Sequence, residues 1–182
     1  MRALSRAIGS LSLLAALAGG ATFPRPAAEF VIRNASGQVL LSQYRGKAIL
    51  LTFMFTNCPH CQHSVGVINQ IQKDFGPRGF QALGAVFNDN AAQLLPDFVA
   101  RFQPVYPIGA TTRDSVIEYL QISPATPMYV PIFVFIDRKG MIREQHIGNE
   151  DKFLDDQDKN SRAAIESMLK EPGSAKKSGK KP

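Results

Sequence analysis

Residues 48–61 read AILLTFMFTNCPHC, an almost continuous apolar run that leads into the only two cysteines of the chain, Cys58 and Cys61. A run of this kind is typical of a strand buried on both faces of a sheet. The next residues, 62–75, carry apolar side chains three and four positions apart and stop before a Gly-Pro pair, which predicts an amphipathic helix. A CxxC motif at a strand-to-helix junction indicates a redox site.

The two cysteines are expected to have different roles. A helix N-terminus offers unpaired N–H groups and a favourable dipole, which stabilise a thiolate on Cys58. Because only the thiolate attacks disulfides, Cys58 is the predicted nucleophile. The two-residue spacing brings Cys61 within one helical turn, where it can attack a mixed disulfide on Cys58 and release the partner. Cys61 is therefore the predicted resolving thiol.

Two other uses of a cysteine pair fit the sequence less well. A zinc site commonly needs four ligands, and the chain has no second cysteine pair. A structural disulfide across a four-residue ring would constrain very little of the unfolded chain.

The rest of the chain predicts a single α/β domain. A hairpin is expected from residues 30–33 and 38–41, followed by further strands at 48–55, 80–87, 106–108, 132–136 and 141–147. Helices are expected at 62–75, between 91 and 102 with Pro96 in the first turn, up to 120 with Asp114 or Ser115 as the cap, and at 160–169. This order predicts a three-layer α/β/α arrangement around a central mixed sheet, with an N-terminal hairpin.

The two ends of the chain differ in composition from this domain. Residues 1–21 pair basic residues with a short apolar run that ends in small residues, a secretory signal pattern. Residues 171–182 are rich in Lys, Gly, Ser and Pro and predict a disordered tail. We therefore expect a domain at 22–170, exported to the periplasm or secreted after signal cleavage; an uncleaved membrane anchor is the alternative.

The positive charge lies mainly in these two ends. The formal net charge is +6, but without Arg2, Arg6 and the four lysines at 176, 177, 180 and 181 the balance is 15 basic against 15 acidic residues. A neutral body does not predict nucleic-acid binding. The Lys-rich tail could make weak contact with an acidic membrane surface.

Three features together carry a resemblance to a known family. These are the order of the secondary-structure elements, the sequence of the segment from Phe30 to Cys58, and residues 131–140, PIFVFIDRKG. From about residue 29 to 169 the chain resembles the thioredoxin fold and, more narrowly, the exported TlpA/ResA-like redoxins of the AhpC/TSA superfamily. The resemblance implies a thiol-disulfide oxidoreductase that uses Cys58 and Cys61 as its redox disulfide and needs no cofactor.

The resemblance also implies a substrate groove beside the cysteines. Val130–Pro131 should be a cis peptide bond that offers the Val130 backbone to an extended substrate, with Pro131 and Pro59 shaping the surface. Pro127 is the alternative position for the cis proline. The implied partners are exported proteins carrying thiols or disulfides and a redox-recycling protein.

Two positions depart from the family pattern. Asn57 stands where thioredoxins and most TlpA-like proteins carry tryptophan, and Thr52 stands where thioredoxins keep a buried aspartate that assists proton transfer to the resolving thiol. Asp and Glu are absent from residues 48–73, so His60, His63 or water must serve if proton transfer needs a group there.

The dipeptide Pro59-His60 resembles that of the DsbA family of disulfide oxidants, as does a valine before the cis proline. A histidine at this position favours the thiolate and makes the disulfide more oxidising, so His60 is predicted to tune the reduction potential. The alternative is a solvated loop histidine. The scaffold and the dipeptide point to different families, which leaves the direction of electron flow open.

Two other functions are found on related scaffolds. Sco-type copper-assembly proteins use a cysteine pair with a distant histidine, which would make Cys58, Cys61 and His146 the copper ligands, although the Sco motif resembles C-x-x-x-C. The signature of peroxiredoxins resembles Pro-x-x-x-Thr-x-x-Cys. In this chain Thr56 is two residues before Cys58, not three, and Leu51 stands at the proline position. We regard copper delivery as the main alternative and peroxide reduction as a weaker one.

Overall fold

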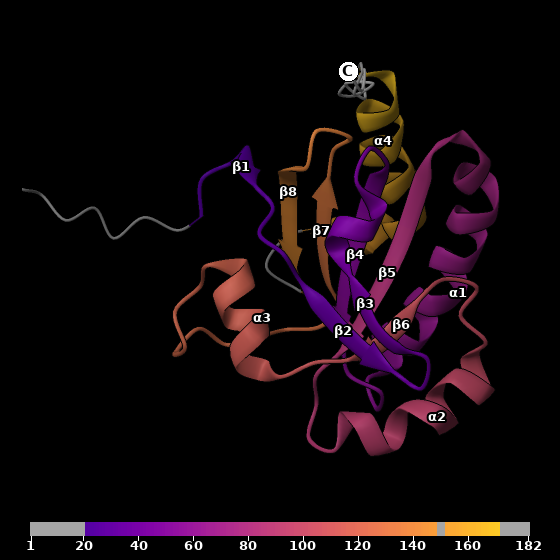
Figure 1. Ribbon diagram of the computed structural model, residues 1–182, viewed down its shortest axis with the longest axis vertical. Coiled ribbons are helices and arrows are strands. Elements are labelled where there is room, and N and C mark those ends of the chain that lie inside the picture. Colours follow the sequence, from indigo (N-terminus) through magenta and orange to yellow (C-terminus); the bar gives the residue numbers. More distant parts are fainter. Residues whose placement is uncertain (1–20, 149–151, 172–182) are drawn as a thin grey trace, which may run out of the picture.

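The computed structural model describes residues 21–148 and 152–171 (Figure 1). Its strands are β1 (Arg25–Pro26), β2 (Val31–Asn34), β3 (Gly37–Leu40), β4 (Ala48–Met54), β5 (Phe80–Val86), β6 (Ile108–Ala110), β7 (Ile132–Ile136) and β8 (Met141–Ile147). They form one mixed sheet in the order β1-β8-β7-β4-β5-β6-β2-β3. The β2–β3 hairpin is the far edge of that sheet, because Arg33 pairs with Ala110 of β6.

The central strand is β4, as the apolar run predicts. All seven of its residues are buried, and it pairs in parallel with β5 and antiparallel with β7. Neighbours on both sides and helices over both faces explain why the strand shows no polar alternation. The cysteine motif begins at Cys58, four residues after the carboxyl end of this strand.

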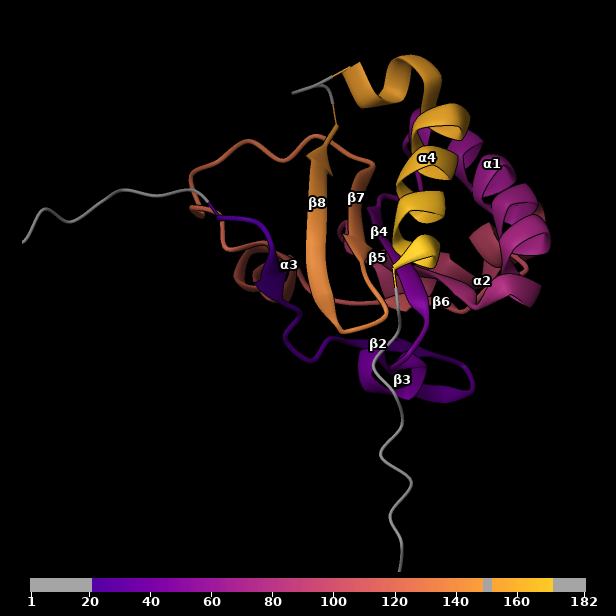
Figure 2. The ribbon, with the colours of Figure 1, turned by 90° about the horizontal axis from the view of Figure 1, so that it is seen from above.

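Helices cover both faces of the sheet. They are α1 (Pro59–Phe75), α2 (Ala91–Phe102), α3 (Arg113–Leu120) and α4 (Gln157–Lys170), with short 3-10 turns η1 (Leu41–Tyr44), η2 (Gly76–Arg78) and η3 (Lys152–Asp156). Figure 2 shows α1, α2 and α4 on one side and α3 on the other. Under α3, the Phe30 ring packs edge-on against Phe53 and Tyr119, with centroids 5.2 and 4.9 Å away. The predicted three-layer α/β/α fold is confirmed.

Several local expectations were wrong. Helix α2 begins at Ala91, so Pro96 lies beyond its first turn. The cap of α3 is Thr112, whose side chain accepts the Ser115 N–H, because the helix begins earlier than Asp114. Strand β1 was missed, since two residues carry no periodic pattern and pair with β8 only through the tertiary fold. The predicted signal segment, apart from Ala21, and the predicted tail, apart from Glu171, lie outside the described residues.

Candidate active site

Cys58 is the N-cap residue of α1. Its backbone is extended, Pro59 opens the first turn, and its Sγ accepts the Cys61 N–H at 3.3 Å. The thiol is partly exposed. A sulfur atom that accepts a backbone N–H at a helix start lies where a negative charge is stabilised. The sequence prediction placed Cys58 at this junction, and the structure agrees.

Cys61 lies one turn further along α1 and is fully buried. Its neighbours include Met54, Val65 and Val86, which are apolar. Burial, and next the hydrogen bond with Cys58, raise the pKa of the Cys61 thiol well above its usual range. The two thiols of one motif therefore lie in opposite environments.

A loop from the other end of the chain packs against Cys58. The Val130–Pro131 peptide bond is cis, and the Val130 carbonyl oxygen lies 3.7 Å from Cys58 Sγ. The Gly148 N–H donates to Pro131 O at 3.1 Å. Gly148 itself packs closely against Tyr129, since a Cβ added at Gly148 would overlap the Cβ and backbone of Tyr129. Residues 129–131 are therefore held by Gly148 and also contact Cys58, while the Tyr129 side chain remains exposed.

The segment before Cys58 is held by side chains that the sequence did not single out. Asn88 Oδ1 accepts the Thr56 N–H at 2.8 Å and the Thr56 hydroxyl at 3.2 Å. Gln62 Nε2 donates to Thr56 O at 2.9 Å. Residues that follow adjacent parallel strands meet at one edge of the sheet, and β4 and β5 are such a pair, which is the signal that could have identified Asn88. Thr56, which stands one position away from the threonine of the peroxiredoxin pattern, is thus part of the support of the segment before Cys58.

His60 and His63 are exposed on the first turns of α1. Together with Gln157 and residues of η3 they line an open cavity of about 250 Å³. Pro59 is exposed beside them. The structure thus brings Cys58, Cys61, Pro59, His60, Val130 and Pro131 to one end of the sheet.

His146 lies apart from this group. Its Nε2 is 3.2 Å from Glu144 Oε2, and its ring stacks on Phe153 with centroids 4.1 Å apart. In the part of the chain that the structure covers, residues 21–148 and 152–171, no three His, Cys, Asp or Glu side chains are grouped to hold a metal ion. The structure does not bring His146 to the cysteine pair. None of the helices in these same residues is both long and apolar enough to cross a membrane.

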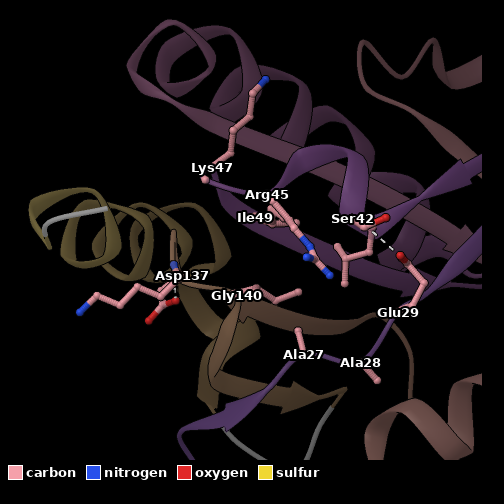
Figure 3. A pocket seen from close by; sticks show the side chains of 13 residues that line it. Ala27, Ala28, Glu29, Ser42, Arg45, Lys47, Ile49, Asp137 and Gly140 are labelled. Atoms are coloured by element: carbon pink, nitrogen blue, oxygen red, sulfur yellow. Dashed lines mark hydrogen bonds between the residues drawn. The ribbon is translucent and has the colours of Figure 1, made fainter. Parts of the chain in front are cut away.

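Another cavity, of about 410 Å³, lies at the opposite end of β4 (Figure 3). Its lining includes Glu29, whose carboxylate accepts the Ser42 N–H at 3.0 Å, and Asp137, which accepts the Lys139 N–H at 2.8 Å. The Arg45 side chain reaches over it, whereas Lys47 points away (Figure 3). Both carboxylates hold neighbouring turns, and the residues that line this cavity include neither Cys nor His.

Comparisons with known proteins agree with the geometry. The family model that describes the AhpC/TSA family matches residues 24–145. The chain belongs to the AhpC/TSA family. The thiol-disulfide oxidoreductase ResA of Geobacillus kaustophilus is 28% identical to this redoxin over 130 residues, 71% of this chain and 69% of that protein. ResA of Geobacillus thermodenitrificans is 25% identical over the same shares.

Solved structures show the same fold. A thiol:disulfide interchange protein of the thioredoxin family from Chlorobium tepidum has a TM-score of 0.65 at 21% identity, covering 82% of this redoxin and 99% of that chain. The thioredoxin domain of a thiol-disulfide oxidoreductase from Bacteroides vulgatus gives 0.63 at 17% identity, with 80% and 99% covered. The fold is thus thioredoxin-like, and the protein is a TlpA/ResA-like redoxin and a thiol-disulfide oxidoreductase.

Proposed function

We propose that this redoxin is exported and exchanges disulfides with the cysteines of other exported proteins. Cys58 attacks the partner, Cys61 resolves the mixed disulfide, and Val130 and Pro131, with Pro59, contact the extended partner chain. The observation that carries the proposal is the environment of the two thiols. Cys58 is partly exposed and accepts the Cys61 N–H, whereas Cys61 is buried one turn away with a raised pKa.

This asymmetry supports an order of events. A partner protein reaches Cys58 first, because Cys61 has no exposed surface. The Val130 carbonyl beside Cys58 Sγ is a hydrogen-bond acceptor for the backbone of an extended substrate. Cys61 then attacks from inside the protein, where no second partner can compete with it.

The test is a pair of variants in a protein disulfide-exchange assay. We expect Cys58→Ser to abolish exchange and Cys61→Ser to accumulate mixed disulfides. Mass spectrometry of these trapped mixed disulfides would also identify the exported partners and the redox-recycling protein. Full activity of the Cys58→Ser protein would disprove the mechanism. A Cys61→Ser protein that turns over without trapped intermediates would remove Cys61 from the resolving step.

His60 is proposed to raise the reduction potential. Titration against glutathione, read by mass after thiol trapping, places the wild-type protein on a scale from about −270 mV for thioredoxin to about −120 mV for DsbA. A value near the upper end indicates an oxidant or isomerase, and a value near the lower end indicates a reductant. His60→Ala should lower the potential, whereas His63→Ala, an exposed histidine of the same helix, is the matched control and should leave it unchanged.

Export is proposed from residues 1–21, whose pattern is that of a cleaved signal. Expression of the full chain in a bacterial host should give a periplasmic protein whose N-terminus lies near residue 22. Recovery of the uncleaved chain in the membrane fraction would instead support an anchor.

A further inference from the structure

Four buried polar side chains lie on α1, α4 and β4, three elements that pack together on one face of the sheet. Thr52, Ser64 and Ser161 are fully buried, and Gln157 is 7% exposed. The Ser64 Oγ lies 2.7 Å from Gln157 Oε1 and 2.9 Å from His60 O. We call these four residues the internal polar cluster.

Three atoms of the internal polar cluster have no hydrogen-bond partner among residues 21–148 and 152–171. They are Thr52 Oγ1, Gln157 Nε2 and Ser161 Oγ, and all three are shielded from bulk solvent. Buried polar groups without a partner are rare, and ordered internal water commonly satisfies them. An amide N–H and two hydroxyls supply the mixture of donors and acceptors that one or two water molecules need.

The cluster lies next to the resolving cysteine. Ser64 follows Cys61 by three residues, so the two side chains share one face of α1. Thr52 lies on the same face of β4 as Leu50 and Met54. Met54 packs in the apolar group that contains Cys61, and Leu50 packs in the group that contains Ile165 of α4. Thr52 is therefore placed beneath the line where α1 and α4 meet.

The cluster also reaches solvent. Gln157 lines the open cavity that His60 and His63 share with η3, while its Oε1 lies within hydrogen-bond distance of the Ser64 hydroxyl inside the protein. Ser161 is one turn further along α4, on the same face as Gln157. A chain of polar groups therefore runs from the surroundings of Cys61 to the surface.

To resolve the mixed disulfide, Cys61 must lose its proton in a site that opposes ionisation. Burial raises the pKa of this thiol, and residues 48–73 contain no carboxylate that could accept the proton. Asp155, Asp156 and Asp158 line the cavity at its outer end, and the groups between that cavity and Cys61 are the neutral side chains of the internal polar cluster.

We propose that the internal polar cluster holds ordered water that accepts the proton of Cys61 and conducts it to the cavity at His60 and His63. The inference rests on the proposed roles of the two cysteines. As the Cys61 S–H bond breaks, its electron pair forms the bond to Cys58 Sγ, the bond from Cys58 to the partner breaks, and the partner leaves as a thiolate. The proton passes through the water to the solvent, where the partner thiolate or the buffer takes it up.

A chromogenic aromatic disulfide, 5,5′-dithiobis(2-nitrobenzoate), separates the two steps in stopped flow. At high reagent concentration the first coloured thiolate is released by Cys58 and the second by Cys61, at a rate independent of reagent. We expect Thr52→Val, which replaces a hydroxyl by a methyl of the same shape, to slow the second release at least about tenfold and leave the first unchanged. Thr52→Ser, which loses volume but keeps the hydroxyl, should retain the wild-type second rate.

The control is Tyr119→Phe, which removes another buried hydroxyl that has no hydrogen-bond partner in the described part of the chain and lies on the opposite face of the sheet. It should change neither rate. A Thr52→Val second phase within about twofold of wild type, or a Thr52→Ser protein as slow as Thr52→Val, would overturn the proton path. Loss of the first phase from the wild-type protein would instead overturn the proposed role of Cys58, so the two failures are distinguishable.

A second measurement does not depend on any variant. A high-resolution crystal structure of the reduced protein should show water within hydrogen-bond distance of Thr52 Oγ1, Ser161 Oγ and Gln157 Nε2. A dry cluster, or one whose side chains satisfy each other directly, would refute the inference.

Discussion

The burial of Cys61 makes the stability of the reduced protein depend on pH in the alkaline range. An unfolded cysteine ionises near pH 8.5, whereas the folded protein keeps Cys61 protonated because burial raises its pKa. Above the unfolded pKa the unfolded state binds fewer protons than the folded state, so the free energy of unfolding falls as pH rises. Between about pH 7 and about pH 10 the loss from this one thiol is about 2 kcal/mol.

Cys61→Ala isolates this contribution. Both proteins are unfolded by urea in the presence of a reductant, at about pH 7 and about pH 10. The variant pays a packing cost at both pH values, but it lacks the ionisation penalty, so its stability relative to wild type should improve by about 2 kcal/mol at the higher pH. The pKa values of Tyr106 and Tyr119 are also raised by burial, and their effects cancel because both proteins contain them. An unchanged difference between the two proteins would mean that Cys61 ionises in the folded state.

Three further predictions concern the frame of the site. Gly148→Ala places a Cβ that overlaps Tyr129, at a φ of +39°, so it should lower the free energy of unfolding by at least about 2 kcal/mol and slow exchange, as urea unfolding and the disulfide-exchange assay would measure. Gly66→Ala, whose Cβ meets open space, should not destabilise the protein. Asn88→Ala leaves the Thr56 N–H unpaired and should cost about 1–3 kcal/mol in urea unfolding, whereas Asn88→Asp keeps the acceptor and most of the stability. Phe53→Ala should cost about 3–5 kcal/mol by the same measurement, because the ring is fully buried among Phe30, Phe87 and Tyr119.

Local pattern was sufficient for the elements that carry strong periodicity. The apolar run of β4, the spaced apolar residues of α1 and the motif between them predict the central strand, the helix and the position of Cys58. The alternation of strands and helices along the chain predicts helices on both faces of the sheet, and these give the three layers. These features depend on residues close together in the sequence.

The supports of the site depend on residues far apart in the sequence, and no local pattern indicates them. Asn88 holds Thr56 across 32 residues, and Gln157 meets Ser64 across 93. Gln157 begins α4 three residues before the predicted start, so the sequence did not place it on the helix face that meets α1. The contact between Gly148 and Tyr129 arises only when β8 lies beside the loop that precedes β7.

The position of the CxxC motif gives the two identical side chains different chemistry. The helix begins at Cys58, so this sulfur lies outside the first turn and accepts a backbone N–H that has no partner within the helix. Three residues later Cys61 lies inside the first turn of the helix, where its side chain is fully buried against the end of β4. A shift of the helix start by one residue would bury the first thiol or expose the second, and either change would remove the difference between an attacking and a resolving cysteine. Three features fix the start of α1: the end of β4 at Met54, the Thr56–Asn88 contact and the proline at the first helical position. Through the helix start they also fix the order of the two thiols in the reaction.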